Sequence, residues 1–286
     1  MKLIAPELAT KPRTDAYLAG AIPNVSRSFI DKLCEQGKVS VNGDIVPGRY
    51  RLKPGDEILL DYDFNQAKLI PEIELPILFE NDDCIVIEKP AGLLTHSKGA
   101  FNPEATVATF IRTKISGFAQ DDDRAGIVHR LDRGTSGVIL CAKTPETLTW
   151  FQKQFSDRKV KKTYYAVIKG TLDPKEALID VPIGRNPRNP KMFYPTIHGK
   201  IATTHYKVIK TNQKYSLIEL KPETGRTHQL RVHLQHIKHS IVGDDFYGGE
   251  PDDRLYLHAG SLEITLPGGD RRVFESKLPE AFDTKV

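Results

Sequence analysis

Short segments rich in β-branched and other apolar residues recur through the C-terminal two thirds of this 286-residue chain and restrict the folds available to it. Five such segments are Ile85–Ile87, Val138–Ala142, Thr163–Lys169, Thr204–Thr211 and Tyr215–Lys221. Their composition and length are typical of β-strands. Residues 212–214, Asn-Gln-Lys, join the last two segments and predict an antiparallel hairpin. We therefore expect a largely antiparallel mixed β-sheet flanked by helices and loops.

Other signals lie between these segments. Thr144 is a helix-capping residue, Pro145 suits the first helical position, and Leu148, Phe151 and Phe155 then supply one apolar face. We expect this helix to pack against the sheet. Residues 184–195 are rich in Asn, Arg and Pro and predict an irregular basic loop, which either contacts a polyanionic partner or is a solvated surface.

The N-terminal part of the chain carries a self-contained pattern from about Thr14 to Asp61. Apolar residues at helical spacing predict one helix around Tyr17–Ile22 and a second around Phe29–Leu33, followed by a glycine. Residues 38–43, Lys-Val-Ser-Val-Asn-Gly, predict a strand entering a tight turn, and residues 54–60 predict another turn and strand. The pattern indicates a small α+β domain.

This N-terminal stretch resembles the S-four RNA-binding module, named from a small-subunit ribosomal protein. The matching residues are Ser26-Arg27-Ser28, Gly37-x-Val39-x-Val41-Asn42-Gly43 and Gly55-Asp56. The resemblance implies RNA contact by the helix pair and the adjoining turn, whose cations are Arg13, Arg27, Lys32, Lys38 and Arg49. Cations attract phosphates whatever the RNA sequence. The alternative is that these side chains only solvate a surface.

Bulk properties exclude a few classes of protein. A net charge of +4 and a pI near 8.8 are compatible with a polyanionic partner but do not require one. The apolar runs are too short for a signal peptide or a bilayer span, so we expect a cytoplasmic protein with no membrane partner. Cys34, Cys84 and Cys141 lie far apart, which disfavours a metal site or a disulfide framework, and we expect reduced, buried thiols.

One carboxylate, Asp132, lies among cations in the segment Gly126–Gly137, which reads Gly-Ile-Val-His-Arg-Leu-Asp-Arg-Gly-Thr-Ser-Gly. Neighbouring positive charge favours the ionised form of an aspartate, and glycines permit backbone conformations closed to other residues. The segment therefore suits a held, reactive carboxylate. Taken alone, Asp132 could equally be an ordinary turn aspartate that accepts hydrogen bonds from backbone amides.

A second constrained turn precedes a predicted basic amphipathic helix in residues 223–233, Glu-Thr-Gly-Arg-Thr-His-Gln-Leu-Arg-Val-His. Leu230, Leu234 and Ile237 form its apolar side. Gly225 directly before Arg226 suggests that this arginine is aimed at a site, and a guanidinium suits a carboxylate partner. Residues 161–167 place an aromatic ring near the start of a strand.

Together these segments resemble the RluA-type pseudouridine synthase family from about Leu75 to the end of the chain. The matching motifs are Lys89-Pro90-x-Gly92, His129-Arg130-Leu131-Asp132-x-x-Thr135-Ser136-Gly137, Lys162-x-Tyr164, Gly225-Arg226-Thr227-His228-Gln229-Leu230-Arg231-x-His233, Val242-Gly243-Asp244 with Tyr247-Gly248, and Leu257-His258-Ala259. The resemblance implies isomerisation of uridine to pseudouridine within RNA, without cofactor or metal. The RNA is expected to be large-subunit ribosomal RNA, with transfer RNA as the alternative.

The resemblance also implies residue roles. Asp132 would be the essential carboxylate, acting either as a nucleophile on the sugar or as a base on its 2′ proton. Arg226 would pair with Asp132, and Tyr164 would stack on the uracil and assist proton removal from carbon 5. Arg130 would fill the space left by the flipped nucleotide, and Leu230 would line the base pocket. Further RNA or base contacts are expected from His129, Arg231, Arg27, Lys32 and Lys38.

The expected organisation is an S-four-like domain over residues 1–63, a linker over residues 64–74, which contains Pro71, and a catalytic domain over residues 75–286. The whole is an α+β protein, and we expect a monomer.

Two other functions use the same residues. A nucleoside glycosylase could use Asp132 to release uracil, and a non-catalytic protein could use the second domain as an RNA platform. The histidines of residues 228–239 lack the i, i+4 arrangement of helical zinc ligands, which disfavours a metal site. Ser136 lacks the Gly-x-Ser-x-Gly context of a serine hydrolase.

Overall fold

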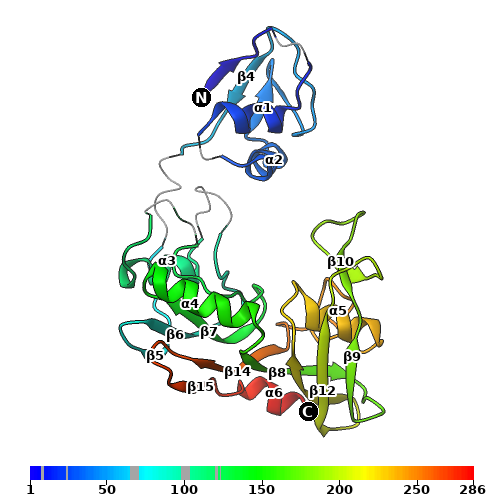
Figure 1. Ribbon diagram of the computed structural model, residues 1–286. Helices are drawn as coiled ribbons and strands as arrows, with labels where there is room; N and C mark the ends of the chain where they lie inside the picture. The colour runs from blue at the N-terminus through cyan, green and yellow to red at the C-terminus, as the bar shows by residue number, and fades with distance from the viewer. Residues whose placement is uncertain (8–9, 24, 65–70, 98–103, 120–121, 123) are drawn as a thin grey trace. The chain divides into compact units, whose positions relative to one another are not determined.

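The computed structural model describes residues 1–7, 10–23, 25–64, 71–97, 104–119, 122 and 124–286 (Figure 1). The chain divides into two compact units. The first comprises mainly residues 1–72, and the second comprises residues 73–95, 106–120 and 124–286. Part of the predicted linker, residues 65–70, lies outside the described residues. No helix of the described chain is long and apolar enough to cross a membrane.

The N-terminal unit is the predicted small α+β fold. Its elements are β1 (Lys2–Ile4), α1 (Thr14–Ala21), α2 (Arg27–Glu35), β2 (Val39–Val41), β3 (Asp44–Ile45) and β4 (Glu57–Leu60). The strands form an antiparallel sheet in the order β1-β4-β2-β3. Ser26 caps α2 by accepting a hydrogen bond from the Phe29 amide at 3.2 Å. Asn42 and Gly43 have positive φ in the turn between β2 and β3, as the Asn-Gly pair predicted.

The second unit is built on one nine-stranded sheet. Its strands are β5 (Ile77–Glu80), β6 (Cys84–Lys89), β7 (Ser136–Ala142), β8 (Lys161–Lys169), β9 (Glu176–Asp180), β12 (Thr203–Thr211), β13 (Tyr215–Pro222), β14 (Leu257–Thr265) and β15 (Arg271–Glu275). The order is β5-β6-β7-β14-β8-β13-β12-β9, with β15 paired to β14. Only β7 and β14 pair in parallel among the described strands. The predicted mixed, largely antiparallel sheet and the β12–β13 hairpin are therefore confirmed.

Helices cover both faces of this sheet. They are α3 (Val107–Ile111), the 3-10 turn Arg112–Lys114, α4 (Pro145–Ser156), α5 (Gln229–His236) and α6 (Glu280–Lys285). α4 begins as predicted, because the Thr144 hydroxyl accepts from the Thr147 amide. Alternate residues of β6 and β7 pack with α3 on one face and with Phe151 of α4 on the other. Figure 1 shows α5 and α6 on opposite sides of the half of the sheet that contains β8.

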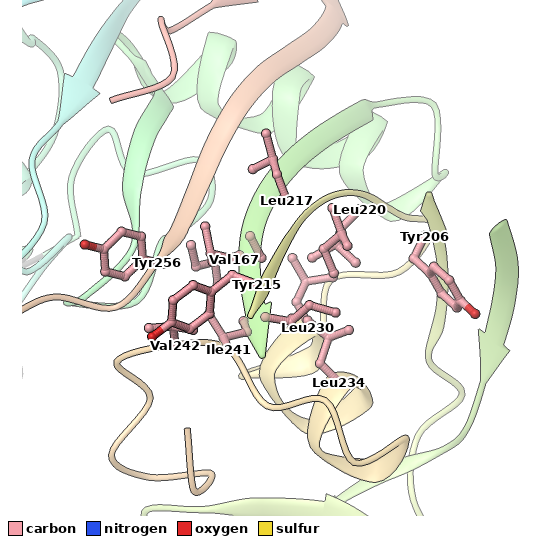
Figure 2. Close-up of a cluster of buried hydrophobic side chains, with 14 of the residues drawn as sticks. Val167, Tyr206, Tyr215, Leu217, Leu220, Leu230, Leu234, Ile241, Val242 and Tyr256 are labelled. Atoms are coloured by element: carbon pink, nitrogen blue, oxygen red, sulfur yellow. The ribbon is translucent and has the colours of Figure 1, made fainter. Parts of the chain in front are cut away.

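The largest buried cluster lies between α5 and the sheet. Figure 2 shows Leu230 and Leu234 of α5 directed toward Leu220 of β13. However, residues 229–234 are all buried, so α5 is not the amphipathic helix that was predicted. Its buried polar residues have partners within the protein, as when His233 contacts the Thr204 hydroxyl at 2.9 Å and the Val181 carbonyl at 3.0 Å. Periodicity alone predicts that such residues face solvent, because their partners lie in distant parts of the chain.

Residues 184–195 do not form the irregular loop that was predicted. They contain most of a two-stranded antiparallel hairpin, β10 (Ile183–Arg185) and β11 (Phe193–Pro195). Met192 and Phe193 pack against a small cluster that includes Tyr247. The side chain of Asn186 accepts from the amides of residues 188 and 189 and so closes the connection between the strands.

The three cysteines are free and buried, as the sequence predicted. Burial raises the pKa of Cys34 to about 11 and that of Cys84 to about 12, and it also raises the pKa of Cys141. All three are therefore thiols at neutral pH and are poor nucleophiles.

Candidate active site

Asp132 lies in a tight turn that leads into β7. Its carbonyl accepts from the Thr135 amide at 3.1 Å, and its side chain is 18% exposed. The turn ends at Gly137, where β7 passes close to β14. Gly137 has φ +112°, and a Cβ at this position would collide with the carbonyl oxygen of Ala259. Glycine is therefore required for the parallel pairing that fixes one end of the turn.

The segment after β6 supports the Asp132 turn from the other side. The buried Lys89 ammonium donates to the carbonyls of Pro90, Leu93 and Arg133 at 2.9, 2.8 and 3.2 Å. The Thr95 hydroxyl exchanges hydrogen bonds with the backbone of Leu131. Burial lowers the pKa of Lys89 to about 7. Lys89 of the Lys-Pro-x-Gly motif thus holds the backbone after Asp132, and Thr95 holds the backbone before it.

The ionic partner of Asp132 is Arg231, on α5. One Arg231 nitrogen, Nη1, lies 3.3 Å from Asp132 Oδ2. The guanidinium also makes a two-point contact with the fully buried Asp244, Nε to Oδ2 at 2.8 Å and Nη2 to Oδ1 at 2.7 Å. Asp244 follows Gly243, where a Cβ would collide with the Arg254 carbonyl. Arg231 is therefore oriented by Asp244 and presents its remaining nitrogen to Asp132.

The prediction that Arg226 pairs with Asp132 is wrong for this structure. Arg226 Nε donates instead to the carbonyl of Ile201 at 3.0 Å. Arg226 lies in the turn before α5, whereas Arg231 lies within the helix on the side facing Asp132. Both arginines line the pocket that contains Asp132. The motif therefore contains the right kind of residue, but the helix phase selects the second arginine, which had been predicted only as an RNA contact.

His228 is a second neighbour of Asp132, and no role had been predicted for it. Its Nε2 lies 3.7 Å from Asp132 Oδ2, and its Nδ1 lies 2.8 Å from the Tyr247 hydroxyl. Burial lowers the pKa of His228, although the charge of Asp132 opposes this. His228 stands inside the matched motif and close to the arginines, which is the signal that could have identified it.

Asp132 opens onto a pocket between its turn, β8 and α5. The lining residues are Arg130, Leu131, Asp132, Thr135, Lys162, Tyr164, Pro222, Thr224, Gly225, Arg226, Thr227, His228, Gln229, Leu230, Arg231 and Leu257. Apolar walls from leucine and tyrosine meet one carboxylate and several cations, which suits an apolar ring attached to a polyanionic chain. The predicted pocket residues Tyr164, Leu230 and Arg130 are thus brought together with Asp132.

Three pocket residues differ in their electrostatics. Burial, followed by the charge of Asp132, raises the pKa of Tyr164, so its hydroxyl stays protonated at neutral pH. Burial lowers the pKa of Lys162 to about 8. Arg130 is exposed and has no hydrogen bond or ion pair with any described residue. Its guanidinium is therefore available to a ligand.

His129 does not line this pocket, so its predicted contact with RNA or base is not seen in the geometry. Its Nε2 accepts a hydrogen bond from the Leu140 amide of β7 at 3.0 Å. Its ring stacks on the ring of Phe155 of α4, with the two centroids 5.0 Å apart. Burial, followed by the charge of Lys162, lowers the pKa of His129 to about 3. A neutral imidazole is required to accept this hydrogen bond, so His129 acts as a structural residue.

This role predicts acid sensitivity. The folded pKa of His129 lies below the unfolded value of 6.5, so its contribution to stability is complete above pH 6.5 and is lost as pH falls toward 3. Between pH 7 and pH 5, the free energy of unfolding should fall by about 2 kcal/mol more in the wild type than in His129→Leu. Urea unfolding at the two pH values measures this difference, and the other histidines cancel because both proteins carry them. Equal pH dependence in the two proteins would contradict the assignment.

The predicted RNA-binding cations of the N-terminal unit lie on its surface. Arg27 is 58% exposed and lies 3.4 Å from the buried Asp15. Lys32 is exposed and has no ionic partner among the described residues, and Lys38 lies 3.2 Å from Asp61. In the part of the chain that the structure describes, no group of three suitable side chains could hold a metal ion.

Comparison with known proteins places both units among RNA-modifying or RNA-binding families. Residues 83–236 match the family model described as RNA pseudouridylate synthase, and residues 15–58 match that of the S4 domain. A protein of Chlorobaculum parvum called an uncharacterized RNA pseudouridine synthase is 38% identical, over 98% of this chain and 94% of its own length.

Two further relatives extend the comparison. A ribosomal large subunit pseudouridine synthase D of Borreliella burgdorferi is 35% identical, over 94% of this chain and 87% of its own length. The solved structure of human RNA pseudouridylate synthase domain containing 1 is 26% identical, with a TM-score of 0.59, over 72% of this chain and 85% of that one. The likeness to the curated relatives therefore spans both units.

Proposed function

The chain belongs to the RNA pseudouridylate synthase family, and we propose that its substrate is large-subunit ribosomal RNA. The observation that carries the proposed chemistry is the Asp132–Arg231 pair at the wall of a pocket with an aromatic and a leucine side chain. The choice of RNA is supported by several relatives named ribosomal large subunit pseudouridine synthase D, at 35 to 38% identity. Transfer RNA is the alternative substrate.

In the proposed reaction the bond from the ribose anomeric carbon to the base nitrogen breaks, the base rotates, and its carbon 5 bonds to the same sugar carbon. The hydrogen of carbon 5 leaves as a proton and the base nitrogen gains one, so the product is an isomer of the substrate. Asp132 either attacks the sugar or removes its 2′ proton. Arg231 orients Asp132 through the ion pair between Nη1 and Oδ2 at 3.3 Å.

The remaining pocket residues would bind the flipped nucleotide. Extruding a nucleotide costs a few kcal/mol of stacking, which new contacts must offset. Tyr164 would stack on the uracil and assist proton removal at carbon 5, and Leu230 would form a wall of the base pocket. Arg130, exposed and without a protein partner among the described residues, would occupy the space left in the RNA.

The two units would divide the work. The S-four-like domain, residues 1–63, would hold the RNA through phosphate contacts. The linker, residues 64–74, would connect it to the catalytic domain, residues 75–286, which would carry out the isomerisation. We propose that a monomer acts on RNA in the cytoplasm.

Tritium release from RNA labelled at uracil carbon 5 tests this function. The proposed isomerase should release tritium into water from large-subunit ribosomal RNA and leave the mass of the unlabelled RNA unchanged. A glycosylase would instead produce free labelled uracil, and a non-catalytic platform would produce neither. Greater release from transfer RNA than from ribosomal RNA would reject the proposed substrate while keeping the reaction.

The N-terminal cations give a separate prediction. Arg27→Ala combined with Lys32→Ala should raise KM for RNA about 10-fold and leave kcat unchanged. The slope of log affinity against log salt concentration should fall by the amount expected for the loss of about two phosphate contacts. The matched control is Lys2→Ala, a cation of the same unit that is paired with Glu57 at 2.8 Å. Titration of labelled RNA at several salt concentrations provides the measurement. A fall in kcat with unchanged KM would contradict a binding role.

A further inference from the structure

His228 is held from both sides of its ring at the start of α5. The backbone there is left-handed, with φ 58° and ψ 16°, which is uncommon for a residue other than glycine and needs support from its surroundings. The support includes the Tyr247 hydroxyl, 2.8 Å from Nδ1, and the aromatic rings of Phe193 and Tyr247, which form T-shaped pairs with the imidazole at 5.6 Å between centroids. The side chain is therefore confined to one orientation.

The hydrogen-bond pattern assigns the tautomer of His228. The Tyr247 hydroxyl oxygen accepts from the Phe193 amide of β11 at 3.0 Å. The hydrogen of that hydroxyl is then free to go to Nδ1 of His228, which becomes an acceptor. A neutral imidazole with Nδ1 accepting carries its own hydrogen on Nε2. That hydrogen lies on the side of the ring facing Asp132.

His228 and Arg231 approach the same carboxylate oxygen. The closest oxygen to both is Oδ2, at 3.7 Å from His228 Nε2 and 3.3 Å from Arg231 Nη1. Oδ1 of Asp132 accepts no hydrogen bond from any described residue. A distance of 3.7 Å is longer than a hydrogen bond, but catalytic contacts often tighten when substrate binds. A small approach of the two groups would complete the contact.

We propose that His228 is a positioning residue for Asp132: its Nε2–H, with Arg231, holds Oδ2 and leaves Oδ1 as the oxygen that reacts with the ribose. This rests on the proposed function, in which Asp132 is the reacting carboxylate. Four charged groups influence the imidazole. The carboxylates of Asp132 and Asp244 favour its protonation, whereas the guanidinium groups of Arg231 and Arg130 oppose it. Burial is the largest influence and keeps His228 neutral at neutral pH. The neutral form is the one the tautomer assignment requires.

Two substitutions of similar size separate positioning from packing. In His228→Gln the terminal amide can occupy the place of Nε2 and donate to Asp132, whereas the amide of His228→Asn is too short to reach it. At saturating RNA, His228→Asn should lower the single-turnover rate about 30-fold, the expected loss for one hydrogen bond to a charged group, with RNA affinity unchanged. His228→Gln should recover most of that loss.

Tyr247→Phe provides an independent variant, because it keeps the ring under the Arg231 guanidinium and removes only the hydroxyl. We expect its single-turnover rate to fall about 5-fold, since the Nδ1–H tautomer of His228 then becomes accessible. Equal rates in His228→Asn and His228→Gln, or a wild-type rate in Tyr247→Phe, would overturn the proposal. The same series tests the proposed function separately. That function holds if the wild-type protein releases tritium and the Asp132→Asn variant does not.

Discussion

Replacing Asp132 with asparagine is expected to lower the rate of pseudouridine formation by at least about 10,000-fold, equivalent to about 5 kcal/mol of transition-state stabilisation. The amide keeps the size of the side chain but neither attacks the sugar nor removes a proton from it. The fold should survive, because Arg231 keeps its two-point contact with Asp244. We expect the free energy of unfolding to change by less than about 1 kcal/mol.

Single-turnover tritium release at saturating RNA measures the effect on chemistry, and urea unfolding measures the effect on stability. The matched control is Asp245→Asn. Asp245 is an exposed carboxylate next to Asp244, and Asp245 does not line the pocket. This control should retain wild-type activity. Activity in Asp132→Asn within about 10-fold of the wild type would exclude an essential role for the carboxylate.

Replacing Arg231 with methionine should damage both stability and activity. It leaves Asp244, whose side chain is fully buried, without a cation, so the free energy of unfolding should fall by about 3 to 5 kcal/mol. It also removes the partner that orients Asp132, so pseudouridine formation should fall by at least about 1,000-fold. Chemical unfolding and single-turnover assays report the two effects separately.

A double variant distinguishes the two causes. Adding Asp244→Asn to Arg231→Met removes the unpaired buried charge and should restore at least about 2 kcal/mol of stability without restoring activity. Arg226→Met serves as the comparison, since Arg226 lines the pocket but pairs with a carbonyl. It should weaken RNA binding and leave stability unchanged. If Arg226→Met abolished chemistry while the double variant remained active, the original prediction from sequence would be right.

Local signals in the sequence were sufficient for much of the fold. The Asn-Gly turn, the Thr144 cap and the β12–β13 hairpin each depend on neighbouring residues, and each is confirmed. The pairing of β7 with β14 joins segments more than a hundred residues apart, and no local pattern specifies it. The β10–β11 hairpin was missed because its stability comes from packing against the distant Tyr247.

The candidate site shows the same division. The sequence motifs predicted a shared site for Asp132, Tyr164 and Leu230, and these three residues line one pocket. They did not distinguish Arg226 from Arg231, because the choice depends on helix phase and on the buried Asp244 13 residues beyond Arg231. His129 was predicted to contact RNA or base, yet its ring packs on Phe155 of α4. Adjacent side chains in an extended turn point in different directions, and the amino-acid sequence alone does not show which of them faces the pocket.

The decisive experiment is to map pseudouridines across ribosomal and transfer RNA in a strain from which this gene has been deleted. The same strain is then complemented with either the wild-type chain or Asp132→Asn. We expect at least one uridine of large-subunit ribosomal RNA to be unmodified without the gene, restored by the wild type and not restored by Asp132→Asn. Restoration by Asp132→Asn, or an unchanged pseudouridine map without the gene, would contradict an account in which Asp132, held by Arg231, isomerises uridine in RNA.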